Sequence, residues 1–119
     1  MQKKVLILGH NDASFLEEVM ACLEGLDLEI HSEDRCPVET GIQFDWTPDA
    51  VIINVTSLKL DKCIKHIKDL SRETLVLAAE RDSSVESYLR MQILGVRDFF
   101  HVPLDPKNLK SAIVELLKL

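Results

Sequence analysis

The sequence predicts one doubly wound α/β domain, in which five parallel strands form a central sheet and helices cover both faces. Short apolar runs alternate along the chain with segments whose apolar residues recur at helical spacing. The runs at residues 5–8 and 50–55 are apolar except at Asn54, which is typical of strands buried on both faces of a parallel sheet. With 119 residues, of which 46% are hydrophobic, we expect a single domain over residues 1–119.

Five strands are expected, at residues 5–8, 26–30, 50–55, 74–79 and 98–102. In the second of them Leu26, Leu28 and Ile30 alternate with acidic residues. Such alternation indicates a half-exposed strand, which we place at an edge of the sheet.

Terminal signals mark the helices between the strands. A glycine follows the helical patterns at Gly25 and again at Gly95. Ser83 and Glu86 form a capping box for the helix that ends at Gly95. Before the last helix, Asp105 is a side-chain cap and Pro106 suits the first helical position.

Two further segments are expected between strands. Residues 58–70 place their apolar side chains within about 120° of one another on a helical wheel. Residues 31–48 contain two prolines and a glycine, so the second helix of the fold is expected to be short or missing.

Composition excludes several functions. The net charge of -6 argues against non-specific binding to nucleic acid or to an anionic membrane surface. The longest apolar runs have four or five residues, far short of a membrane span, and no signal peptide is recognisable. Cys22, Cys36 and Cys63 have neither disulfide nor metal-site spacing, so we expect free thiols in a reducing cytoplasm.

The carboxyl ends of parallel strands meet at one edge of the sheet, where ligands bind in such folds. At this edge the sequence resembles the receiver domain of bacterial two-component response regulators, over nearly the whole chain. The most specific part of the resemblance is GVRDFFHVPLDP, at residues 95–106. The resemblance implies a flavodoxin-like sheet of order 2-1-3-4-5 and a role in phosphorelay signalling.

In the family, an aspartate at the end of the third strand accepts a phosphoryl group. A hydroxyl after the fourth strand and a lysine after the fifth orient and neutralise the phosphoryl oxygens. Here the acceptor position is Asn54, the hydroxyl position is Ala78, and the lysine position before Pro103 is Val102. An amide carries no charge and its lone pair is delocalised, so Asn54 cannot replace the carboxylate.

The family also places two acids after the first strand, where they hold Mg²⁺. The pair aligns with Gly9 and His10 or with His10 and Asn11, and Asp12 is the one carboxylate in that loop. One carboxylate with an amide and an imidazole makes a poor Mg²⁺ site. The sequence therefore looks like a pseudo-receiver: we expect no enzymatic activity, no metal and no cofactor. Its degenerate pocket comprises Gly9, His10, Asn11, Asp12, Ala78, Val102 and Pro103.

Two surface features follow from the resemblance. Phe99 occupies the position of the family's switch aromatic and, without a hydroxyl at Ala78, is expected to be fixed by packing in one rotamer. The face formed by the fourth helix, fifth strand and fifth helix is expected to bind another protein or domain, or a second copy of the chain. It includes Arg90, Met91, Arg97 and Asp98.

Two alternatives remain beside the phosphorylation-independent interaction module. The residues from Gly95 onward also resemble the amino-terminal atypical receivers of pilus-assembly localisation proteins related to the MinD/ParA ATPases, which implies a targeting domain of a larger protein. Small residues at Gly9, Asn54 and Ala78 would instead leave room for a small ligand, as in a sensor.

Overall fold

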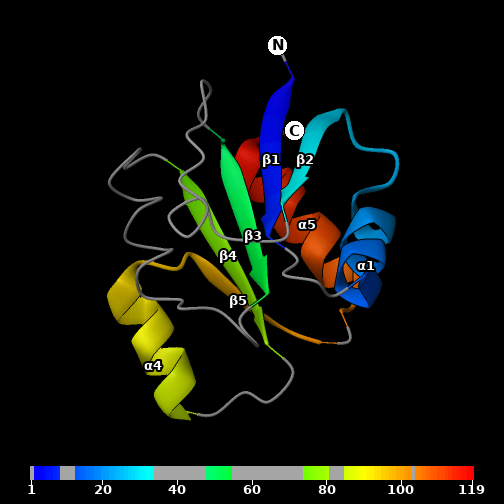
Figure 1. Ribbon diagram of the computed structural model, residues 1–119. Helices are drawn as coiled ribbons and strands as arrows, with labels where there is room; N and C mark the ends of the chain where they lie inside the picture. Colours follow the sequence, from blue (N-terminus) through cyan, green and yellow to red (C-terminus); the bar gives the residue numbers. More distant parts are fainter. Residues whose placement is uncertain (1, 9–12, 34–47, 55–73, 81–84, 103) are drawn as a thin grey trace.

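The computed structural model describes residues 2–8, 13–33, 48–54, 74–80, 85–102 and 104–119 (Figure 1). The strands are β1 (Lys3–Leu8), β2 (Leu28–Glu33), β3 (Ala50–Asn54), β4 (Leu75–Glu80) and β5 (Asp98–His101). The described helices are α1 (Ala13–Leu23), α4 (Val85–Leu94) and α5 (Pro106–Leu117).

All five strands are parallel and form one sheet of order β2-β1-β3-β4-β5, which confirms the predicted fold class and strand order. β2 lies at one edge, as its composition predicted. Its first four residues are all half-buried, so the expected alternation of burial is not seen. An edge strand has no neighbour on its outer side, and solvent therefore reaches both of its faces. β5 forms the other edge.

The main core lies between the sheet and the helices α1 and α5, which cover the same face (Figure 1). It joins Ile7 and Ile52 of the central strands to Phe15 of α1 and to Leu109 and Ile113 of α5. Side chains that point to the opposite face of β1, β3 and β4 are buried as well, namely Leu6, Leu8, Val51, Ile53, Val76 and Ala78. β1 and β3 are therefore buried on both faces, as their continuous apolar runs predicted.

The helix ends agree with the capping signals in the described residues. The Asp105 side chain accepts a hydrogen bond from Lys107 N at 3.0 Å, and Pro106 is the first residue of α5. Gly25 and Gly95, just after α1 and α4, have φ of 86° and 88°, a left-handed conformation that glycine adopts without strain. Ser83 lies outside the described residues.

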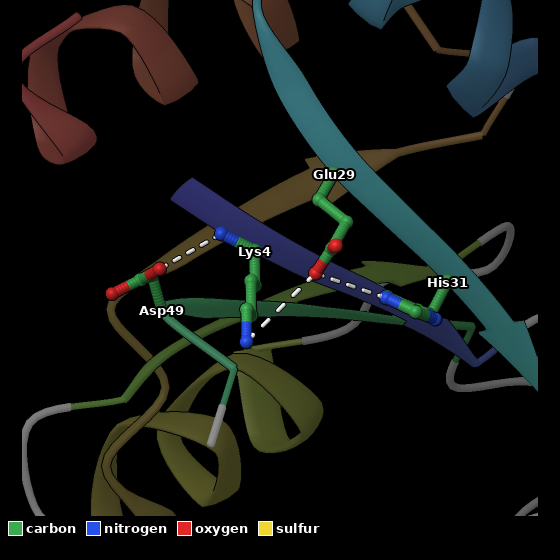
Figure 2. A network of polar contacts seen from close by, with 4 residues as sticks. All are labelled: Lys4, Glu29, His31 and Asp49. Atoms are coloured by element: carbon green, nitrogen blue, oxygen red, sulfur yellow. Dashed lines mark hydrogen bonds and ion pairs between the residues drawn. The ribbon is translucent and has the colours of Figure 1, made fainter. Parts of the chain in front are cut away.

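Main-chain and side-chain contacts tie together the amino ends of three neighbouring strands (Figure 2). Lys4 N donates to the Asp49 carboxylate at 2.8 Å, and Asp49 N donates back to Lys4 O at 2.8 Å. Leu75 N then donates to Asp49 O, and the buried Thr74 hydroxyl donates to Pro48 O. Thr74, predicted as a strand residue, thus precedes β4. These contacts hold the amino ends of β1, β3 and β4 in register, so the carboxyl ends of the three strands lie at the same edge of the sheet.

A second set of contacts links β1 to the outer strand β2. Glu29 lies 3.2 Å from His31 Nε2 and 3.9 Å from Lys4 Nζ (Figure 2). The three side chains are 39–44% exposed, so solvent screens the charges and each pair contributes about 0–1 kcal/mol. Apolar burial, rather than these ion pairs, fixes the register of β2.

Cys22 is buried in the core, as predicted, and behaves as a small apolar residue. Burial raises the pKa of its thiol, and the charges of Glu18 and Asp105 raise it further. Cys36, Cys63 and the helix predicted over residues 58–70 lie outside the described residues, as does most of the segment 31–48. Among the described residues, no helix is long and apolar enough to span a membrane.

The Asp105 cap generates a stability prediction. Asp105→Ala leaves the Lys107 N–H without its acceptor and is expected to lower the free energy of unfolding by about 1 kcal/mol in urea denaturation. Asp105→Asn keeps a capping oxygen and should stay close to the wild type. Equal losses in the two variants would contradict this assignment.

Candidate functional site

The position expected to accept a phosphoryl group lies at the carboxyl end of the central strand. Asn54 is the last residue of β3, is 3% exposed, and is in register with Ala79 of β4. Every residue of β3 is buried. The residue that the resemblance puts at the acceptor position is thus a neutral amide at the end of a buried strand.

The hydroxyl position and the switch aromatic are neighbours in the sheet. Ala78 of β4 is the register partner of Phe99 of β5, the arrangement that the resemblance implies. Ala78 is fully buried and presents only a methyl group. This position therefore has no oxygen with which to bind a phosphoryl group or to direct Phe99.

The lysine position follows directly after β5. Val102 N donates to Glu80 O at 3.0 Å, so the main chain continues the ladder beyond the strand. Val102 is partly buried and packs against the main core cluster, which includes Leu104 and Leu109. The residue that the resemblance puts at the lysine position thus makes an apolar contact.

The loop after β1 lies outside the described residues, and with it Gly9, His10, Asn11 and Asp12, as well as Pro103. Of the described pocket residues, only Asn54 has a side-chain oxygen, so this part of the donor set does not fit Mg²⁺, which requires several oxygen ligands. The same described residues contain no group of three His, Cys, Asp or Glu that could hold a metal. The small-ligand pocket beside Gly9 stays a prediction.

Phe99 is held between two aromatic rings from different elements. Its ring centre is 6.1 Å from that of Tyr88 in α4 and 6.0 Å from that of His101, both edge to face. Packing of this kind favours a single ring orientation. That Phe99 keeps a single rotamer stays a prediction. The sequence analysis did not identify Tyr88 and His101 as its contacts. Phe99 and His101 are two residues apart on one strand, so the sequence could have indicated that their side chains lie on the same face.

The helix α4 exposes an apolar stripe that the sequence analysis also missed. Val85, Leu89 and Ile93 of α4 are 75%, 51% and 86% exposed. They recur every fourth residue, so they share one side of the helix. Arg97 and Asp98 are exposed at the start of β5, as expected for a partner surface. The side chains of Arg90 and Met91 lie outside the described part of the structure.

Hollows lie on both sides of β5. An open groove of about 590 Å³ runs between the strand and α5, where Phe100 and Ser111 both line it. A smaller hollow of about 60 Å³ lies between β5 and α4, beside Tyr88 and Phe99. An edge strand beside an open groove, next to a helix that exposes apolar side chains, is suited to binding another protein.

The comparisons identify the fold. No protein-family model and no curated protein matches the chain. Among solved structures, the BeF₃-activated receiver domain of DrrB, a Thermotoga maritima response regulator, is 20% identical with a TM-score of 0.85, and 100% of each chain is covered. A CheY-like receiver domain protein from Methanospirillum hungatei is 15% identical with a TM-score of 0.84, and 99% of this chain and 95% of that one are covered.

The narrower resemblance also has a structural counterpart. A candidate pilus assembly protein from Burkholderia thailandensis is 19% identical with a TM-score of 0.79, and each chain is covered over 100% of its length. At such identities these matches establish the fold. The chain has the receiver fold of response regulators.

Proposed function

We propose that the protein is a non-enzymatic interaction module with a receiver fold, which binds its partner without being phosphorylated. The observation that carries this proposal is Asn54, a buried amide at the end of β3 where a receiver has its acceptor aspartate. An amide is neutral and a poor nucleophile, so no acyl phosphate forms at this position.

The neighbouring positions support the same reading. Phosphoryl transfer depends on cations and donors that neutralise the oxygens of the transferred group. Ala78 supplies a methyl group and Val102 an apolar side chain, both packed into the fold. Each of the three replacements by itself removes a different part of the chemistry, so reverting one of them would not restore it.

We place the partner surface on α4, β5 and α5. The exposed apolar stripe of α4 and the groove beside β5 support this placement, and Arg97 and Asp98 add charges of both signs at the start of the strand. The occupant is another protein or domain or a second copy of the chain. The net charge of -6 disfavours nucleic acid and anionic membranes as partners, and free thiols suit a cytoplasmic location.

A localisation domain of a pilus-assembly ATPase is the second candidate. The match to the Burkholderia thailandensis protein over its full length favours it. In this case the gene's reading frame would continue beyond Leu119 into an ATPase domain with a phosphate-binding loop. A frame that stops at Leu119 would exclude this candidate.

The absence of phosphorylation can be measured directly. After incubation with Mg²⁺ and acetyl phosphate, intact mass spectrometry should show the unmodified chain, because no carboxylate stands at Asn54. A phosphorylatable receiver domain treated in parallel is the positive control. A gain of one phosphoryl group by the wild type would refute the proposal.

Reverting the acceptor alone should not restore the reaction. Asn54→Asp supplies a carboxylate but leaves Ala78 and Val102 unchanged, so the same treatment should again give no phosphoryl adduct. The new carboxylate is buried, and unfolding at pH 7 should cost about 1–3 kcal/mol less than for the wild type.

This loss of stability should depend on pH. Burial raises the pKa of the introduced carboxyl in the folded state, so the penalty is present at neutral pH and disappears as the pH falls below about 4. Asn54→Ser, whose side chain is small and neutral, is the control whose stability should not depend on pH in this way.

Efficient phosphorylation of Asn54→Asp by acetyl phosphate would contradict this account, because it would show that the metal site is intact.

A further inference from the structure

We propose that two copies of the chain join their β2 strands edge to edge, antiparallel, about a two-fold axis at Ile30. The two five-stranded sheets would then form one continuous sheet of ten strands. This inference goes beyond the proposed function, because β2 lies at the opposite edge of the sheet from β5. The surface of α4, β5 and α5 would stay open on each copy, so the dimer would present two such surfaces.

The first observation is that β2 is the longer and less protected of the two edge strands. It has six residues, Leu28–Glu33, whereas β5 has four. Edge strands are commonly protected by lysine, by proline, or by contacts that occupy their outer peptide groups. On β5 the Asp98 carboxylate accepts a hydrogen bond from Phe99 N at 2.9 Å. The sequence of β2 contains neither lysine nor proline, so this edge is the better template for pairing.

The second observation fixes which peptide groups of β2 face outward. Lys4 N and Lys4 O both bond to Asp49, which leads into β3, so the peptide groups of Lys4 point away from β2. These groups alternate along a strand, and those of Val5 therefore point toward β2. In a parallel pair the register partner of such a residue points away, so Ile30, the partner of Val5, faces outward. Ser32, two residues further along β2, does the same.

The register of an added copy follows from these outward groups. In an antiparallel pair about Ile30, the N–H and C=O of Ile30 would bond to those of the partner's Ile30. Ser32 N of each copy would donate to Leu28 O of the other copy, while Leu28 N keeps its bond to Leu26 O at 3.0 Å. Four main-chain hydrogen bonds would thus join the two copies.

The third observation is that the side chains of β2 match each other in this register. Ile30 would stand opposite the partner's Ile30, on the face of the sheet that packs against the main core. Ile30 is only half-buried in the single chain, so an adjoining strand would remove more of its apolar surface from water. On the other face, Glu29 would stand opposite the partner's His31, and His31 opposite the partner's Glu29. A carboxylate and an imidazole make a favourable cross-strand pair.

Within one chain, Glu29 already lies beside two basic side chains. Its carboxylate is 3.2 Å from His31 Nε2 and 3.9 Å from Lys4 Nζ (Figure 2). Two copies joined about Ile30 would bring two such groups together, and each carboxylate would gain the partner's imidazole as a neighbour. The pairing therefore adds an acceptor beside each imidazole and a donor beside each carboxylate.

Charge selects this axis over its two neighbours. An axis at Glu29 would place the two Glu29 carboxylates opposite each other, and an axis at His31 would place Glu29 opposite the partner's Glu33. Like charges directly opposite each other destabilise a sheet. About Ile30, like charges meet at the ends of the pair, where the exposed Asp27 approaches the partner's Glu33 and solvent screens both.

The three observations together indicate a second copy as the occupant of this edge. An extended peptide could use the same outward peptide groups, but the described side chains of β2 match their own sequence. A second copy supplies the Ile30 contact and both pairs of Glu29 with His31 through one symmetry operation. The strand is therefore self-complementary, as a two-fold interface requires.

A proline at the outer edge tests the strand pairing. Ser32 is exposed and its N–H points away from β1, so Ser32→Pro should keep the fold while removing two of the four hydrogen bonds between copies. Sedimentation equilibrium should show a dimer for the wild type, weakened about tenfold or more in Ser32→Pro. Ser32→Ala, which keeps the N–H, is the matched control and should dimerise within a few-fold of the wild type. Circular dichroism and urea unfolding check that the proline variant is folded.

A charge substitution tests the axis without altering the main chain. His31→Glu would place two pairs of like charges across the axis and should weaken the dimer about tenfold. His101→Glu makes the same change at an exposed position of β5, the opposite edge strand, and should leave dimerisation unchanged. This pair of variants decides the question even where Ser32→Pro fails to fold.

A cross-link tests the strand register. In a chain with Cys22→Ala, Cys36→Ser and Cys63→Ser, Glu29→Cys mixed with His31→Cys should give a disulfide-linked dimer of the two variants under mild oxidation. The reason is that opposite residues without mutual hydrogen bonds bring their Cα atoms to about 4.5 Å in an antiparallel pair. Each variant oxidised alone is the control, since the axis offsets each cysteine from its own copy by two residues.

Two outcomes would overturn the inference. A wild-type chain that stays monomeric at all concentrations rules out the second copy. A dimer that keeps its strength in folded Ser32→Pro and in His31→Glu, or that cross-links as well in each cysteine variant alone as in the mixture, places the interface elsewhere. Neither outcome touches the lack of phosphorylation, which the intact mass measures separately, so failure of this inference is distinguishable from failure of the proposed function.

Discussion

Burial of the central strand on both faces is the constraint that governs the site. β3 lies between β1 and β4, all of its residues are buried, and its last residue is Asn54. A carboxylate at such a position needs nearby cations or donors to offset its desolvation. Val102 packs against the core and Ala78 offers a methyl group, so neither of these two residues supplies one. The side chains of Asn54, Ala78 and Val102 are thus all uncharged, as burial at this end of the sheet favours.

Neutral residues at Asn54, Ala78 and Val102 restrict what this part of the carboxyl edge can bind, while the parallel sheet keeps the receiver order. Phe99, which the resemblance marks as a switch, is held by Tyr88 and His101. Polar contacts such as the Lys4–Asp49 pair keep the strands level without any contribution from the pocket. Most of the large apolar side chains that the described residues expose lie on α4, namely Val85, Tyr88, Leu89 and Ile93. This distribution fits a protein that is recognised through a permanent surface rather than a switched one.

Much of the fold could be predicted because its signals are local. Continuous apolar runs identified β1 and β3, and Asp105 with Pro106 marked the start of α5. The strand order came from the resemblance. The outward stripe of α4 was not predicted, since helical spacing defines a face but does not say which way that face points. The contact of Tyr88 with Phe99 depends on how α4 crosses the sheet, which no local pattern records.

The central claim is that no activated, phosphoryl-bound state exists for this receiver fold. The most direct test is the amide NMR spectrum of the isotope-labelled protein, recorded before and after addition of Mg²⁺ with beryllofluoride, the activating group of the DrrB receiver domain. Our account predicts superimposable spectra, with the resonances of Asn54, Ala78 and Phe99 unmoved. Saturable shifts of these three resonances would show that the pocket binds the phosphoryl mimic, and would contradict the account.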